Sequence, residues 1–115
     1  MSFKDRFEAG VAKFNLRAKS DPQIQEALRQ YAGRSVTLKV TDDTVYVFYL
    51  EKDGIRLEVS PENAPEDMYL ETSKEILQRM IDEKKLNPAD LLLGRIKWRN
   101  IGLKEVSIVR KIMGV

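Results

Sequence analysis

The spacing of apolar residues changes in the middle of this chain, and the change restricts the folds open to it. Val36, Leu38 and Val40 alternate with polar residues, and residues 55–59 repeat this two-residue period. Alternation of this kind is typical of half-buried β-strands. On either side of this stretch, apolar residues recur at spacings of three and four, which is typical of amphipathic helices. The sequence therefore predicts a β-meander flanked by helices, as in an α+β domain.

The middle strand of this meander is expected at residues 45–50, whose sequence Val-Tyr-Val-Phe-Tyr-Leu is apolar on both faces. A turn at residues 42–44 precedes it. Residues 52–54 form a tight hairpin after it, and we expect Asp53 and Gly54 to be its type I′ pair.

The first helix is expected from residue 3 to about residue 18. Phe3, Phe7, Val11 and Phe14 recur on one of its sides. This stripe predicts a helix docked on the protein's own core. The alternatives are a lid over a ligand cavity and an anchor on a membrane surface.

Cap residues mark the starts of three further helices. Asp21 is followed by Pro22, which suits the first helical position. Thr72 is followed three residues later by glutamate, as in a capping box. Asn87 precedes a very short apolar helix that Gly94 ends.

Two more strands and a closing helix are expected in the last third of the chain. Residues 68–71 form the fourth strand, and residues 95–99 form the fifth, with Ile96 and Trp98 alternating with basic residues. Residues at helical spacing then predict a helix over 101–113: Leu103, Val106, Val109, Ile112 and Met113. The order α-α-β-β-β-β-α-α-β-α describes one α+β domain over residues 1–115, with a five-stranded sheet.

The residue types restrict any catalysis to carboxylates, lysine, tyrosine, serine and threonine. The chain has no cysteine and no histidine, which removes the disulfide, the thiol nucleophile, the commonest general base and the usual zinc ligands. Its turn carboxylates, such as Asp42 and Asp43, have local roles, and those of residues 62–67 have no partner motif. No glycine-rich phosphate loop or nucleophile elbow is present in the sequence. We expect no catalysis, no metal and no cofactor.

Charge gives little support to a nucleic-acid partner. Twenty basic and 18 acidic residues leave a net charge of +2. Trp98 alternates with the basic residues of its strand and so faces the opposite side, which argues against a base-stacking platform. The longest apolar run, residues 45–50, is too short to span a bilayer, and the charged first ten residues lack the apolar core of a signal peptide. We expect a cytoplasmic protein with no nucleic-acid partner and no stable membrane insertion.

The last third carries a recognisable pattern. An extended Met68-Tyr-Leu-Glu-Thr leads into a capped helix, and Lys85-Leu-Asn-Pro88 is followed by Ala89-Asp-Leu-Leu-Leu-Gly94 and the basic strand Arg95-Ile-Lys-Trp-Arg99. In these residues the chain resembles the sterol-carrier-protein type 2 family, and the first half agrees in its order of elements. The resemblance implies a five-stranded, mostly antiparallel sheet covered on one face by helices. It also implies an apolar tunnel that in this family holds fatty acids, fatty acyl-CoA, sterols or other lipids without catalysis.

One departure from the family lies after the last strand. The family usually has a glycine and an acidic residue there, whereas this chain has Arg99-Asn100-Ile101-Gly102. We expect this turn, and with it the tilt of the closing helix, to be reshaped. Cavity size and ligand class are therefore left open.

Ten apolar residues are candidates for binding the lipid: Phe48, Leu77, Met80, Ile81, Leu91, Leu92, Trp98, Val106, Val109 and Met113. The alternative is that all ten belong to an ordinary core. An empty cavity of about 300 Å3 would cost about 7 kcal/mol, which rivals the stability of a whole domain. We therefore expect the site either to hold a lipid or to be collapsed.

Basic residues near the C-terminus extend the hypothesis to a headgroup. Arg95, Lys97 and Arg99 are expected on one face of the last strand, and Lys104, Arg110 and Lys111 lie on the closing helix. They form either a solvated face or a contact for an anionic headgroup or a CoA phosphate. The alternative to lipid binding is a protein-interaction or dimerisation module with a collapsed core. A homodimer is also compatible with lipid binding.

Overall fold

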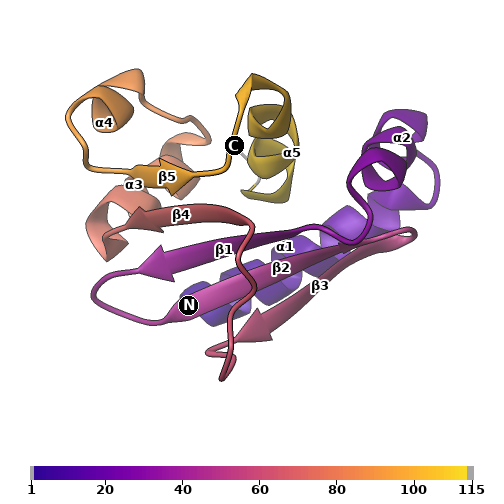
Figure 1. The fold of residues 1–115 in the computed structure, drawn as a ribbon, viewed down its shortest axis with the longest axis horizontal. Helices are drawn as coiled ribbons and strands as arrows, with labels where there is room; N and C mark the ends of the chain where they lie inside the picture. Colours follow the sequence, from indigo (N-terminus) through magenta and orange to yellow (C-terminus); the bar gives the residue numbers. More distant parts are fainter. Residues whose placement is uncertain (1, 114–115) are drawn as a thin grey trace.

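The computed structural model describes residues 2–113, apart from the side chain of Leu91. Five helices and five strands follow one another in the expected order (Figure 1). Their bounds are α1 Phe3–Ala18, α2 Pro22–Tyr31, β1 Ser35–Val40, β2 Val45–Glu51, β3 Gly54–Val59, β4 Met68–Thr72, α3 Lys74–Glu83, α4 Pro88–Leu92, β5 Lys97–Arg99 and α5 Leu103–Met113.

The five strands form one sheet in the order β3-β2-β1-β4-β5. All neighbouring pairs are antiparallel except β1 and β4, which run parallel. The parallel pair arises because residues 60–67 carry the chain from the β3 edge across the sheet to the far side of β1 (Figure 1). Helices α1, α3 and α5 cover the face of the sheet opposite to the one that residues 60–67 cross. The mostly antiparallel sheet with helices on one face is thus confirmed.

Helix α1 is part of the core. Phe7 and Phe14 are buried, and the Phe7 ring makes edge contacts with Tyr46 and Phe48 of β2 at centroid distances of 4.9 and 5.5 Å. Edge-to-face geometry at this distance is favourable for aromatic pairs. The predicted docking of α1 on the sheet is confirmed.

The hairpin between β2 and β3 differs from the predicted one. Glu51 pairs with Gly54, so the turn consists of Lys52 and Asp53, and no residue of this hairpin has a positive φ. A type I′ pair at Asp53 and Gly54 is therefore wrong. Gly54 is required for a different reason, because a Cβ there would lie 2.4 Å from Asn15 Oδ1 of α1.

Asn15 fixes this hairpin to α1. Its Nδ2 donates to the Ile55 carbonyl (2.9 Å), and its Oδ1 accepts from the Ile55 N–H (2.7 Å). The side chain therefore satisfies both backbone groups of one edge-strand residue, as a neighbouring strand would.

We expect Gly54→Ala to lower the free energy of unfolding by about 2 kcal/mol, because the new methyl group must displace the Asn15 amide and leave Ile55 unpaired. Urea denaturation followed by circular dichroism measures this change. Gly10→Ala is the matched control. Its Cβ would meet nothing within 4 Å, so the better helix propensity of alanine should stabilise the protein by about 0.5–1 kcal/mol. Equal effects of the two changes would contradict the role given to Asn15.

The cap of α3 lies one residue later than predicted. Ser73, not Thr72, accepts from the N–H of Ile76 (3.3 Å). Thr72 stays in β4, where it is buried and its hydroxyl donates to the carbonyl of Arg95 (3.1 Å). The caps predicted at Asp21 and Asn87 are confirmed by hydrogen bonds from Gln23 N–H (2.9 Å) and Ala89 N–H (3.0 Å).

The closing helix begins at Leu103, and its buried stripe is shifted from the predicted one. Leu103 is 94% exposed, whereas Ile108 is buried. The turn before it relies on Asn100, which adopts the left-handed conformation (φ 58°) and donates through Nδ2 to the Asp67 carbonyl (3.2 Å). Asparagine tolerates this left-handed conformation better than most residues other than glycine. No helix within residues 2–113 is both long and apolar enough to cross a membrane.

Candidate functional site

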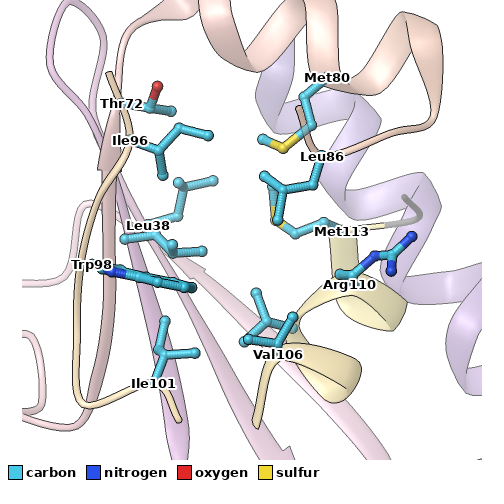
Figure 2. Close-up of a pocket in the computed structure, with 12 residues that line it drawn as sticks. Leu38, Thr72, Met80, Leu86, Ile96, Trp98, Ile101, Val106, Arg110 and Met113 are labelled. Carbon is cyan, nitrogen blue, oxygen red and sulfur yellow. The ribbon is translucent and has the colours of Figure 1, made fainter. Parts of the chain in front are cut away.

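An apolar pocket lies between the sheet and helices α3 and α5 (Figure 2). Its volume is about 40 Å3. It is lined by Leu38, Leu70, Thr72, Met80, Leu86, Ile96, Trp98, Ile101, Val106, Val109, Arg110 and Met113. Only Thr72 and Arg110 of this lining are polar.

Strand register builds one side of the pocket. Leu38 of β1 pairs with Leu70 of β4, and Leu70 pairs with Trp98 of β5. Directly paired residues point to the same face of a sheet, so these three side chains form one row beneath the helices.

The opposite side comes from helix periodicity. Val106, Val109, Arg110 and Met113 recur at spacings of three, one and three along α5, which places them on adjoining faces of the helix. Met80 of α3 completes this side and faces the sheet residues across the pocket (Figure 2).

Neither polar side chain makes the interior polar. The Thr72 hydroxyl is already bonded to the Arg95 carbonyl. The side chain of Arg110 is exposed, and its guanidinium points away from the pocket (Figure 2). The space itself therefore suits hydrocarbon, with a cation at its rim.

A buried carboxylate on α4 joins α3 to the segment that precedes β5. Asp90 of α4 is 3% exposed and accepts two hydrogen bonds from Arg79 Nη2 of α3 (2.7 and 2.8 Å) and one from Arg95 Nη1 (3.2 Å). Its backbone carbonyl accepts the N–H groups of Arg95 and Ile96 (2.9 and 3.1 Å). This cluster ties α3 to the segment that carries Ile96 into the pocket.

The hydrogen bonds from Arg79, and then the side-chain hydrogen bond from Arg95, lower the pKa of Asp90 below its ordinary value. A carboxyl group whose pKa is lower in the folded protein stabilises the fold above the unfolded-state pKa, and this stabilisation is lost as pH falls through the folded-state pKa. We therefore expect the stability of the protein to fall below about pH 4.

Asp90→Asn should weaken this dependence, because it removes the titrating group while retaining one acceptor oxygen. Urea denaturation across the acidic range measures the slope. Asp53→Asn, in the exposed hairpin turn, is the control for loss of a carboxylate. Asp67, whose pKa is lowered mainly by its hydrogen bond from Arg34, should leave a residual slope in either variant. An unchanged slope in Asp90→Asn would contradict the assignment.

Half of the ten sequence candidates line the pocket, namely Met80, Trp98, Val106, Val109 and Met113. Phe48 and Leu77 are buried elsewhere in the core. Ile81 faces a separate groove between α1 and α5, and Leu92 is 86% exposed. The side chain of Leu91 lies outside what the structure describes.

Seven lining residues are not among the ten lipid candidates: Leu38, Leu70, Thr72, Leu86, Ile96, Ile101 and Arg110. Of these, the sequence suggests only Arg110 for the site, as a headgroup contact. The strand residues among them follow the same alternation as the rest of the core, so nothing in the pattern separates pocket from core. Leu86 and Ile101 lie in connections that have no period. The aspartate at position 90 was a usable signal, because it is a lone charge within an otherwise apolar run.

The predicted basic face of the last strand is divided. Lys97 and Arg99 lie on the outer face of the sheet, where Lys97 pairs with Glu71 (3.8 Å) and Arg99 covers the Tyr69 ring (4.3 Å). Arg95 precedes β5 and turns to Asp90 instead. In the described residues, no three acidic side chains come together as metal ligands.

No protein-family model and no curated protein sequence matches this chain. Solved structures resemble it in fold. A protein described as UbiJ-SCP2 ubiquinone synthesis protein matches 99% of this chain and 93% of its own length, with a TM-score of 0.65 and 16% identity. The sterol carrier protein domain 2 of Helicoverpa armigera gives a TM-score of 0.60 at 18% identity, over 90% of this chain and 84% of its own. The apo form of sterol carrier protein 2 from Yarrowia lipolytica gives 0.56 at 17% identity, over 93% and 85%. These likenesses establish that the chain has the fold of sterol carrier protein 2 domains.

Proposed function

We propose that this protein binds one molecule of a lipid of the fatty-acid, acyl-CoA or sterol-like class, and carries it without catalysis. The observation that supports this most is the apolar pocket between the sheet and α5, because its interior offers contacts to hydrocarbon and few to anything else. The structural neighbours named as sterol carriers agree with the proposal.

The pocket must widen to hold such a lipid. Its volume of about 40 Å3 is far below the roughly 300–1,000 Å3 of pockets that enclose small ligands. In this proposal the narrow pocket is the closed form of the site, which avoids the cost of a large empty cavity. Burying a chain of sixteen methylenes contributes about 12 kcal/mol of favourable free energy before other costs. This is enough to offset the free-energy cost of widening the pocket.

The start of α5 is the wall best suited to move. It is held by exposed or half-buried polar contacts, such as Arg34 Nη1 to Glu105 Oε1 (3.7 Å), and contacts of this kind contribute little stability. The second half of α5 is anchored by the buried Ile108 and Ile112. Lifting the first turns would widen the pocket without unseating the helix. The unbranched side chains of Met80 and Met113 can adapt to the new shape.

The absence of catalysis is part of the proposal. Neither histidine nor cysteine exists in the chain, and the only hydroxyl in the lining, that of Thr72, is engaged with a backbone carbonyl. The lining therefore lacks an acid, base or nucleophile directed at a ligand. Its single cation, Arg110, is placed to meet an anionic headgroup at the rim.

Native mass spectrometry of the purified chain, followed by organic extraction, tests the proposal. A stoichiometric lipid that is released on denaturation is expected, and extraction identifies its class. If the protein is purified empty, palmitate, palmitoyl-CoA or a sterol should raise its melting temperature. An apo mass with no thermal shift from any of the three would refute lipid binding and favour an interaction module with a closed core.

A further inference from the structure

Charge is distributed unevenly along this chain. Residues 84–113 contain eight lysines and arginines but only two acidic residues, a net charge of +6. Residues 1–83 contain 12 basic and 16 acidic residues, a net charge of −4. All eight cationic side chains of residues 84–113 are exposed. The small overall charge thus conceals a basic region and an acidic remainder.

Exposed apolar side chains gather in the same segment. Among the described residues, five large hydrophobic side chains are exposed, and four of them belong to residues 84–113. Leu92 ends α4, Leu93 follows it, Trp98 lies in β5 and Leu103 begins α5, with exposed fractions of 86%, 65%, 43% and 94%. Leaving leucine in water without a partner forfeits the free energy of its burial.

The four exposed apolar side chains belong to elements that lie together at one edge of the sheet. β5 is an edge strand, and α4 and the start of α5 flank it directly in sequence and in space (Figure 1). We call this region the β5-edge surface. It carries the four exposed apolar side chains and four exposed cations: Leu92, Leu93, Trp98, Leu103, Arg95, Lys97, Arg99 and Lys104. Trp98 also lines the pocket, so the β5-edge surface and the pocket share a residue.

We infer that the β5-edge surface docks peripherally on an anionic lipid bilayer. Exposed leucines and a tryptophan among lysines and arginines have the composition that binds at a membrane interface, where the apolar groups enter the acyl boundary and the cations meet lipid phosphates. The inference goes beyond the proposed function, because docking does not require a lipid in the pocket.

A bilayer fits this surface better than other partners. In a symmetric dimer the same patch would face itself, which would place the cations of one copy against those of the other. Nucleic acid would meet the cations but would leave Leu92 and Leu103 without apolar contacts. A bilayer satisfies both kinds of side chain.

The test is co-sedimentation of the full chain with phosphatidylcholine vesicles, with and without phosphatidylglycerol, at low salt. Binding is expected only to the anionic vesicles. A blue shift in the emission of Trp98, the sole tryptophan, should accompany it. The double variant Leu92→Ser/Leu103→Ser should weaken the partition by about tenfold or more, because both apolar anchors are lost. Both leucines are exposed, so the melting temperature should change little.

Leu16→Ser is the matched control, since Leu16 is 67% exposed but lies on α1, outside the β5-edge surface. It should leave vesicle binding unchanged. Lys97→Ala/Lys104→Ala should weaken binding, because both lysines belong to the β5-edge surface, whereas Lys19→Ala/Lys52→Ala should not.

Three results would overturn the inference: no binding to anionic vesicles, equal losses from Leu16→Ser and the double variant, or tight binding of an oligonucleotide in place of vesicles. A dimer that Leu92→Ser/Leu103→Ser dissociates, in a protein that ignores vesicles, would assign the surface to a second copy of the chain. A protein that docks on vesicles but never carries lipid would refute the proposed function and leave this inference standing.

Discussion

Replacing Phe7 with alanine is expected to lower the free energy of unfolding by about 4 kcal/mol, the range found when a buried phenylalanine is truncated in a core. The Phe7 ring is 6% exposed and contacts the rings of Tyr46 and Phe48 edge-on. Its loss leaves a cavity where α1 meets the sheet and removes two favourable aromatic pairs. Urea denaturation followed by far-ultraviolet circular dichroism measures the change.

Phe3→Ala is the control within the same stripe. Phe3 is half-buried and stacks on Phe7 at 6.2 Å, so its removal should cost about 1 kcal/mol. A loss below about 1 kcal/mol for Phe7→Ala would indicate that α1 separates from the sheet easily, as a lid or membrane anchor would. In that case α1, and not α5, would be the element that moves to admit the lipid.

The order of helices and strands could be predicted because local patterns dictate it. The two-residue period of β1 and the apolar β2 place them inside the sheet, and the caps at Asp21 and Asn87 define helix starts that the structure retains. These signals depend on residues adjacent in the chain, which is why they survive without tertiary information.

The errors arise where a distant residue overrides a local preference. The neighbouring Asp53 predicts a type I′ turn at Gly54, but the small size of Gly54 is needed by Asn15, which lies 39 positions earlier. Thr72 resembles a helix cap, yet the carbonyl of Arg95 takes its hydroxyl and Ser73 caps the helix. Neither partner is visible in a local window of sequence.

The pocket was harder to predict than the fold. Residues on α5 could be proposed because apolar side chains recur at helical spacing on one of its faces. Whether that face packs tightly or borders a cavity depends on the register of β1, β4 and β5. Trp98 was placed on the helix-covered face from alternation alone, and its pairing with Leu70 confirms that side. Hydrophobicity alone suggests that Leu92 lines the lipid site, but the short α4 leaves its side chain exposed to solvent.

The second large effect concerns ligand binding, and it rests on the proposed function. Val106→Phe is expected to raise the Kd for the bound lipid roughly a hundredfold. Val106 is half-buried on α5 and lines the pocket, so a phenyl ring there would occupy space that the lipid needs. Excluding about four methylenes at about 0.8 kcal/mol each costs about 3 kcal/mol, which corresponds to that change in Kd. Displacement of a fluorescent fatty-acid analogue measures the affinity.

Ser107→Phe is the matched control, because it adds a ring at the next position of α5, where the side chain is exposed and does not line the pocket. It should bind lipid with nearly unchanged affinity, and circular dichroism should show both variants folded. The comparison locates the lipid: if Val106→Phe binds as tightly as the parent chain, the ligand does not lie between the sheet and α5. If Ser107→Phe also loses affinity, the lipid lies instead in the groove between α2 and α5, which Val106 and Ser107 both border.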